Sequence, residues 1–81
     1  MADVQLNNLI DEGWLVLYEG FDKGAFQNWQ SLALMYLTKA FGPDHSYTRS
    51  FRAYVQKPEE LSVLIGGGIL EAAREEFRKK R

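Results

Sequence analysis

The chain has 81 residues, of which 46% are hydrophobic and 14% aromatic, so it suits one folded domain and is not an intrinsically disordered segment. The net charge is −1, and the strong basic excess typical of nucleic-acid-binding domains is absent. Cysteine is absent, the start of the chain lacks the features of a secretory signal, and no apolar run could span a bilayer, so we expect a single cytoplasmic domain over residues 1–81.

The first predicted helix covers residues 4–19, with Asp3 as its N-cap. Apolar residues recur there at helical spacing and define one face that we expect to be buried. This face consists of Leu6, Leu9, Ile10, Gly13, Trp14 and Leu17. The segment 20–24 begins and ends with glycine and predicts the first turn.

The second predicted helix covers residues 24–41, with Asp22 as its cap. Its apolar stripe consists of Phe26, Trp29, Ala33, Tyr36, Leu37 and Ala40. Gly42 is predicted to be the left-handed residue that ends this helix, and Pro43 follows as a stop. These two residues give the clearest boundary in the chain.

The third predicted helix covers residues 46–56, is capped by Asp44 or Ser46, and ends before Pro58. Its expected core face consists of Tyr47, Phe51, Tyr54 and Val55. The fourth predicted helix covers residues 59–79, with Pro58 close to its first turn. Its expected core stripe consists of Leu61, Leu64, Ile65, Gly68, Ile69, Ala72 and Phe77.

Four amphipathic helices joined by short loops predict an all-α fold. Loops of this length make helices that follow one another in the chain antiparallel neighbours. We therefore expect a compact four-helix bundle.

The run Gly66-Gly67-Gly68 has two possible interpretations. It resembles the start of a dinucleotide-binding fingerprint, but the third glycine position is occupied by Glu71 and no second parallel strand follows. The preferred interpretation is a glycine-interrupted helix, in which the run allows close packing of another helix or a kink. The packing partner could belong to the same bundle or to a second subunit.

No catalytic, cofactor or metal site is expected. His45 is the only histidine and has no second nitrogen or sulfur ligand to complete a metal site. The adjacent carboxylates at 11–12 and 59–60 diverge on a helix, and the serines lack the context of a nucleophile. Arg49 and Arg52 lie between tyrosines, but we assign the tyrosines to the core and expect no nucleic-acid partner. The sequence therefore predicts that the chain is not an enzyme.

Several apolar residues fall outside the predicted core faces of the first two helices. They are Leu15, Val16, Tyr18, Leu34 and Met35. Methionine and tyrosine are enriched at protein interfaces, and no basic face flanks these positions as membrane-surface binding would require. We therefore predict a protein-interaction or oligomerisation module whose partner is a protein, with a homo-oligomer as the leading expectation. The alternative is a sensor that binds a nucleotide or another anion near the glycine run or at a helix N-terminus.

The order of several landmarks also resembles a known type of module. The landmarks are the segments 9–13, 37–42 and 68–70 together with Phe26, Trp29, Asp44, Tyr47 and Phe51. In this order they resemble a small helical module at the N-terminus of bacterial multidomain proteins, some of which carry a TIR-like or predicted nucleotide-binding domain and are associated with phage defence. The resemblance implies an adaptor or oligomerisation role without catalytic residues. No effector domain follows Arg81, so we expect either an excised domain or a standalone relative.

Overall fold

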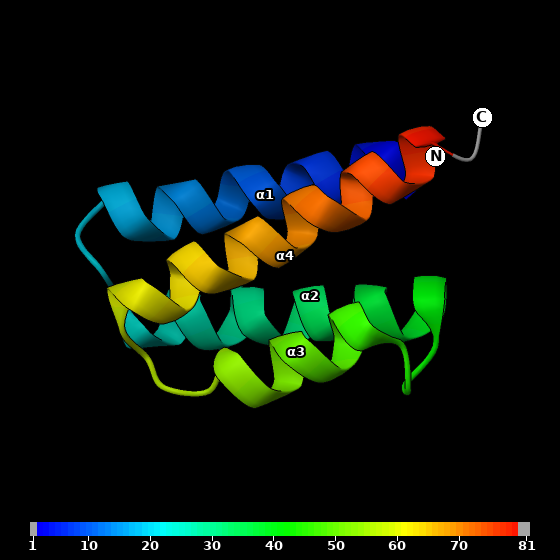
Figure 1. Cartoon of the computed structure of the whole chain (residues 1–81). Coiled ribbons are helices and arrows are strands. Elements are labelled where there is room, and N and C mark those ends of the chain that lie inside the picture. Colours follow the sequence, from blue (N-terminus) through cyan, green and yellow to red (C-terminus); the bar gives the residue numbers. More distant parts are fainter. Residues whose placement is uncertain (1, 80–81) are drawn as a thin grey trace.

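The computed structural model describes residues 2–79, which form four helices joined by short loops (Figure 1). The helices are α1 (Ala2–Tyr18), α2 (Lys23–Phe41), α3 (Ser46–Tyr54) and α4 (Glu60–Lys79). Helices that follow one another in the chain run in opposite directions. No β-strand occurs within residues 2–79, so the predicted all-α four-helix bundle is confirmed.

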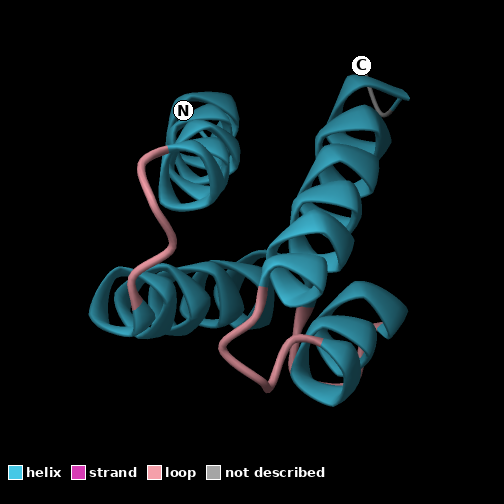
Figure 2. Ribbon diagram, turned by 90° about the vertical axis from the view of Figure 1, so that its left-hand side faces the viewer, coloured by secondary structure: helices cyan, strands magenta, loops and turns pink. Residues whose placement is uncertain are grey.

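The helices are arranged in two layers (Figure 2). One layer contains α1 and α2, and the other contains α3 and α4. Each helix packs against the next in the chain, and α4 closes the bundle by packing against α1. A hydrogen bond of 2.9 Å from Arg74 Nη1 to Asn7 Oδ1 joins the last turns of α4 to the first turns of α1. Because α4 packs on the layer of α1 and α2 with one side, its opposite side is not covered by that layer.

Both ends of α2 carry the local signals that the sequence predicted. The side chain of Asp22 accepts a hydrogen bond of 3.0 Å from the Ala25 backbone N–H, so this cap is confirmed. At the other end, the Gly42 N–H donates to the Thr38 carbonyl at 2.9 Å. Gly42 has the positive φ of 99° that favours glycine, but its ψ of 157° lies outside the left-handed helical region. The chain therefore leaves α2 more extended than a left-handed cap would allow.

Two of the predicted helix caps are wrong. Helix α1 begins at Ala2, so Asp3 lies in its first turn instead of preceding it. Helix α3 is capped by His45, whose Nδ1 accepts a hydrogen bond of 3.1 Å from the Tyr47 N–H, and not by Asp44 or Ser46. The reason is positional: His45 directly precedes the helix with extended backbone angles, whereas Ser46 is already helical.

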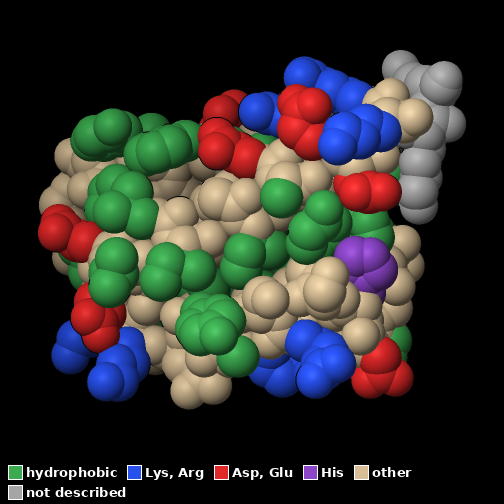
Figure 3. Space-filling view, viewed as in Figure 1, with side chains coloured by type: hydrophobic (Ala, Val, Ile, Leu, Met, Phe, Trp, Pro, Cys, Tyr) green, Lys and Arg blue, Asp and Glu red, His purple; other side chains and the backbone are tan. Residues whose placement is uncertain are grey.

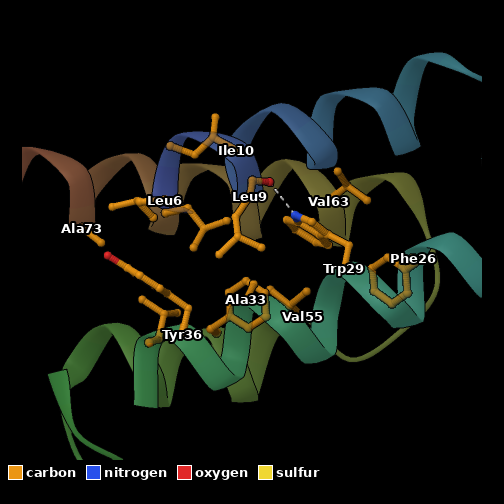
Figure 4. Packing of buried hydrophobic residues seen from close by; sticks show 13 residues of the cluster. Leu6, Leu9, Ile10, Phe26, Trp29, Ala33, Tyr36, Val55, Val63 and Ala73 are labelled. Atoms are coloured by element: carbon orange, nitrogen blue, oxygen red, sulfur yellow. Dashed lines mark hydrogen bonds between the residues drawn. The ribbon is translucent and has the colours of Figure 1, made fainter. Parts of the chain in front are cut away.

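Trp29 of α2 lies at the centre of the core (Figure 4). Its indole Nε1–H donates a hydrogen bond of 2.7 Å to the Leu9 carbonyl of α1. A Cβ on Gly13 would lie 3.1 Å from the ring, and a Cβ on Gly66 would lie 2.7 Å from its Cη2 atom. The indole thus fits between two helices that approach it at glycines, one on α1 and one on α4.

The buried face of α4 differs from the predicted one. The residues that point into the core are Ser62, Val63, Gly66, Leu70 and Ala73. Leu61, Leu64, Gly68 and Ala72, which we expected in the core, are exposed instead. The cause is the size of the aromatic rings on the other helices: small residues on α4 make room for Trp29 and Phe51. Tyr54 of α3 and Ala40 of α2 were also expected in the core and are exposed.

Candidate interaction surface

The five residues predicted to form an interaction surface do not share one face. Leu15 and Val16 border a groove between α1 and α2. Leu34 borders a separate depression between α2 and α3, together with Phe51. Val16 and Leu34 are half-buried against the core, whereas Leu15, Tyr18 and Met35 are exposed.

The structure assembles a different apolar surface from three helices. It consists of Trp14 and Tyr18 of α1, Tyr54 of α3, and Leu61 and Leu64 of α4, and we call it the apolar face. The exposed fractions of these residues range from 38% for Trp14 to 75% for Tyr18. Among the predicted surface residues, only Tyr18 belongs to it. The helical spacing predicts that the other four lie in the core.

One ring contact, two shared depressions and the spacing of Leu61 and Leu64 by about one helical turn connect the residues of the apolar face. The rings of Trp14 and Tyr18 are stacked, with centroids 5.8 Å apart. Trp14 and Leu64 border one shallow depression between α1 and α4, and Tyr54 and Leu61 border another between α3 and α4. Hydrophobic side chains gather on this side of the molecule, over the last turns of α1 and the first turns of α4 (Figure 3).

One signal in the sequence could have revealed this surface. Large apolar residues in the first half of α4 occupy more of the helix circumference than one buried stripe requires. They are Leu61, Val63, Leu64, Ile65, Ile69 and Leu70. A helix that is apolar on two sides must bury both or leave one exposed. Here Val63 and Leu70 are buried, and Leu61 and Leu64 are exposed.

The three glycines of the run lie in different surroundings. Gly66 is buried against Trp29, Phe51 and Val55. A Cβ on Gly67 or Gly68 would meet no atom within 4 Å, so these two glycines make no close packing within residues 2–79. All three lie inside the continuous helix α4, where their N–H groups take part in helical hydrogen bonding. The run therefore does not offer a phosphate the free N–H groups of a helix N-terminus.

A hollow lies between α1 and α2. It has a volume of about 360 Å³ and is bordered by Leu15, Val16 and Trp29. Three carboxylates, those of Glu12, Glu19 and Asp22, lie around it. Their negative charge disfavours binding of a nucleotide or another anion in this hollow, as the alternative function would require.

Within residues 2–79, no group of three or more potential ligand side chains could hold a metal ion, and no helix is long and apolar enough to cross a membrane. His45 lies at the N-terminus of α3, where it caps the helix. Its ring packs against Phe41, with centroids 4.7 Å apart, and against Tyr47, with centroids 4.9 Å apart. The histidine therefore serves as a helix cap within an aromatic cluster.

Tyr47 makes the stability of this cluster dependent on pH. Burial raises the pKa of the Tyr47 hydroxyl, and the charge of Glu76 and the hydrogen bond to it, 3.4 Å long, raise this pKa further. A raised pKa in the folded state means that the neutral phenol stabilises the fold. This contribution is complete below the unfolded pKa of about 10 and is lost as the pH rises through the folded pKa.

We therefore expect wild type to lose stability between about pH 9.5 and 11.5 more steeply than Tyr47→Phe, which cannot ionise. Urea unfolding midpoints measured across this range by circular dichroism test the prediction. All other ionisable groups are the same in the two proteins, so the difference between their pH profiles isolates the Tyr47 hydroxyl. Parallel pH profiles would show that Tyr47 ionisation does not contribute.

The chain was also compared with known proteins. No family model, curated protein or solved structure matches it. The functional inference therefore depends on the surface itself.

Proposed function

We propose that this chain is a non-catalytic, cytoplasmic protein-interaction module that binds a partner protein through the apolar face. The supporting observation is the outward side of α4, where Leu61 and Leu64 are exposed next to Trp14 on α1. Single apolar residues on a surface are common, but a continuous group of this kind is typical of a binding site. Its aromatic content is also typical of interface centres.

The composition of the apolar face favours a protein over a small molecule. The depressions that it contains are shallow, whereas small-molecule sites enclose most of the ligand surface. No charged residue belongs to the face, and its edge carries Lys57 and Glu59 near Leu61. An apolar centre with a polar rim is the usual anatomy of a protein interface. The resemblance to helical adaptor modules of bacterial multidomain proteins supports the same proposal.

A pair of matched double variants tests this assignment. Leu61→Glu with Leu64→Glu places charges on the apolar face, at residues that are 61% and 48% exposed. Leu15→Glu with Met35→Glu places the same charges elsewhere, at residues that are 52% and 53% exposed. Because all four side chains are about half exposed, neither double variant should disturb the core. Circular dichroism and thermal unfolding check that both proteins fold.

We expect the first double variant to lose binding and the second to retain it. The measurement is affinity capture from a lysate of the source organism, with each captured protein identified by mass spectrometry and compared across the variants. Burying two introduced carboxylates in an interface should weaken binding by at least roughly a hundredfold, since each unpaired charge costs several kcal/mol. A partner that is lost only with the Leu15 and Met35 pair would refute the apolar face as the binding surface.

A further inference from the structure

The groove between α1 and α2 and the last residues of the chain carry opposite charges. We propose that this groove binds the basic segment 78–81 of a second copy of the chain, so that copies associate head to tail. The groove is a different surface from the apolar face. The inference therefore goes beyond the proposed function and does not depend on it.

The groove combines apolar side chains with carboxylates. Leu15 and Val16 border it together with Glu12, Glu19 and Asp22. Its volume of about 360 Å³ lies within the range of roughly 300–1,000 Å³ that is usual for binding clefts. Lysine and arginine suit such a groove, because their aliphatic stems pack on apolar surface while their charged ends reach a carboxylate.

The carboxylates of the groove have no cationic partner in their own chain. Within residues 2–79, the ion pair formed is that between Arg78 and Glu75. Asp22 accepts the Ala25 N–H, which leaves its negative charge in place. Lys23 follows Asp22 in the chain but does not border the groove. The negative charge of the groove is therefore available to a cation from outside.

The matching positive charge lies at the C-terminal end of α4. Four consecutive basic residues occur there, namely Arg78, Lys79, Lys80 and Arg81, and nowhere else in the chain are two basic residues adjacent. Arg78 and Lys79 are exposed, and residues 80–81 lie outside the described part of the chain. The pair between Arg78 and Glu75 is also exposed and hence weak, so Arg78 can exchange it for a carboxylate of the groove. This charge complementarity identifies the segment 78–81 as the occupant.

The positions of the two sites require that they meet between copies. The connection from α1 to α2, which borders the groove, and the C-terminal end of α4 lie at opposite ends of a molecule 37 Å long (Figure 1). One chain therefore cannot place its own segment in its own groove. A contact between two different surfaces leaves one of each free, so association continues beyond a dimer unless a ring closes.

Analytical ultracentrifugation of the purified chain over a wide concentration range tests the proposal. We expect the average mass at low salt to rise from 9.3 kDa beyond twice that value. Contacts between exposed charges weaken in about 1 M salt, where the Debye length is roughly 3 Å, so the mass should return toward that of the monomer. A chain that stays monomeric at every concentration in low salt would overturn the proposal.

Two variants test which surfaces meet. The groove variant is Glu12→Lys/Glu19→Lys, and its segment is intact. The segment variant has an intact groove and carries four substitutions, Arg78→Gln, Lys79→Gln, Lys80→Gln and Arg81→Gln. The substituted residues that the structure describes are exposed, so both variants should fold, which circular dichroism checks. Each variant alone should associate at least roughly tenfold more weakly than wild type, because one of the two charged surfaces is lost.

Mixed in equal amounts, the two variants should form a one-to-one dimer and no larger species. The intact segment of the groove variant then binds the intact groove of the segment variant, and the two altered surfaces do not bind each other. A mixture that associates no better than its components would refute the head-to-tail contact.

Two further variants serve as controls. Asp44→Lys/Glu71→Lys changes the net charge by the same amount as the groove variant, at exposed residues that do not border the groove, and should associate like wild type. Leu61→Glu/Leu64→Glu should also associate, because the apolar face takes no part. Loss of association in either control would contradict the groove as the binding site. If head-to-tail association fails while Leu61 and Leu64 are still needed to capture a partner, only this inference is refuted and the proposed function stands.

Discussion

Replacing Trp29 by alanine should leave the domain close to unfolded at room temperature. The side chain is buried, contacts Gly13 and Gly66, and donates the 2.7 Å hydrogen bond to the Leu9 carbonyl. Removing a buried aromatic side chain costs about 3–5 kcal/mol, because the apolar contacts are lost and a cavity remains. A domain of this size has a total stability near the lower end of about 5–15 kcal/mol.

The matched control for this prediction is Trp14→Ala. Trp14 is partly exposed and stacks on Tyr18, so its removal should cost only about 1 kcal/mol. Urea unfolding followed by circular dichroism at 222 nm measures both variants without relying on tryptophan fluorescence. If Trp29→Ala were within about 1 kcal/mol of wild type, the indole would not be the centre of the core.

Substitution by alanine should change the free energy of unfolding in opposite directions at Gly66 and at Gly68. Alanine stabilises the interior of a helix by about 1 kcal/mol relative to glycine, so both variants share this gain. At Gly66 the new Cβ would lie 2.7 Å from Trp29 Cη2 and 3.0 Å from Phe51 Cε2, so buried rings would have to shift. Overpacking of this kind costs about 1–3 kcal/mol.

We therefore expect Gly66→Ala to destabilise the domain by up to about 2 kcal/mol and Gly68→Ala to stabilise it by up to about 1 kcal/mol. Thermal and urea unfolding give the two values, measured at a low protein concentration so that self-association does not contribute. Both substitutions gain the same helix propensity, whereas the surroundings of the new Cβ differ between the two positions. Equal stabilisation by both substitutions would contradict the close approach of α4 to Trp29.

Helix α4 has apolar residues on its buried side and on its exposed side, so the sequence alone could not predict which side is buried. Its first half has apolar residues on both sides, so helical spacing supports two stripes about equally well. The stripe with larger side chains, which includes Leu61 and Leu64, was the natural choice for the core. The structure buries the stripe with smaller residues instead, which includes Gly66 and Ala73. Only the position of Trp29 on another helix decides between them.

Tertiary packing likewise decides how exposed the predicted interaction residues of α1 and α2 are. Residues outside the expected core of α1 and α2 were taken as exposed, but Val16 and Leu34 are half-buried against neighbouring helices. Conversely, Trp14 follows the core spacing of α1 but lies at the edge of the contact with α4. A residue at the border of a helical face is buried only if the adjacent helix is close enough to cover it.

The sequence by itself determined the helices and most of their ends. Periodic apolar residues predicted four helices, and local chemistry placed the cap at Asp22 and the turn at Gly42, because these signals act within a few residues. Tertiary structure decided which side of α4 is buried, what Gly66 contacts, and which apolar residues meet on one surface. Those outcomes depend on the sizes and positions of side chains far apart in the chain, above all on Trp29 filling the space between α1 and α4.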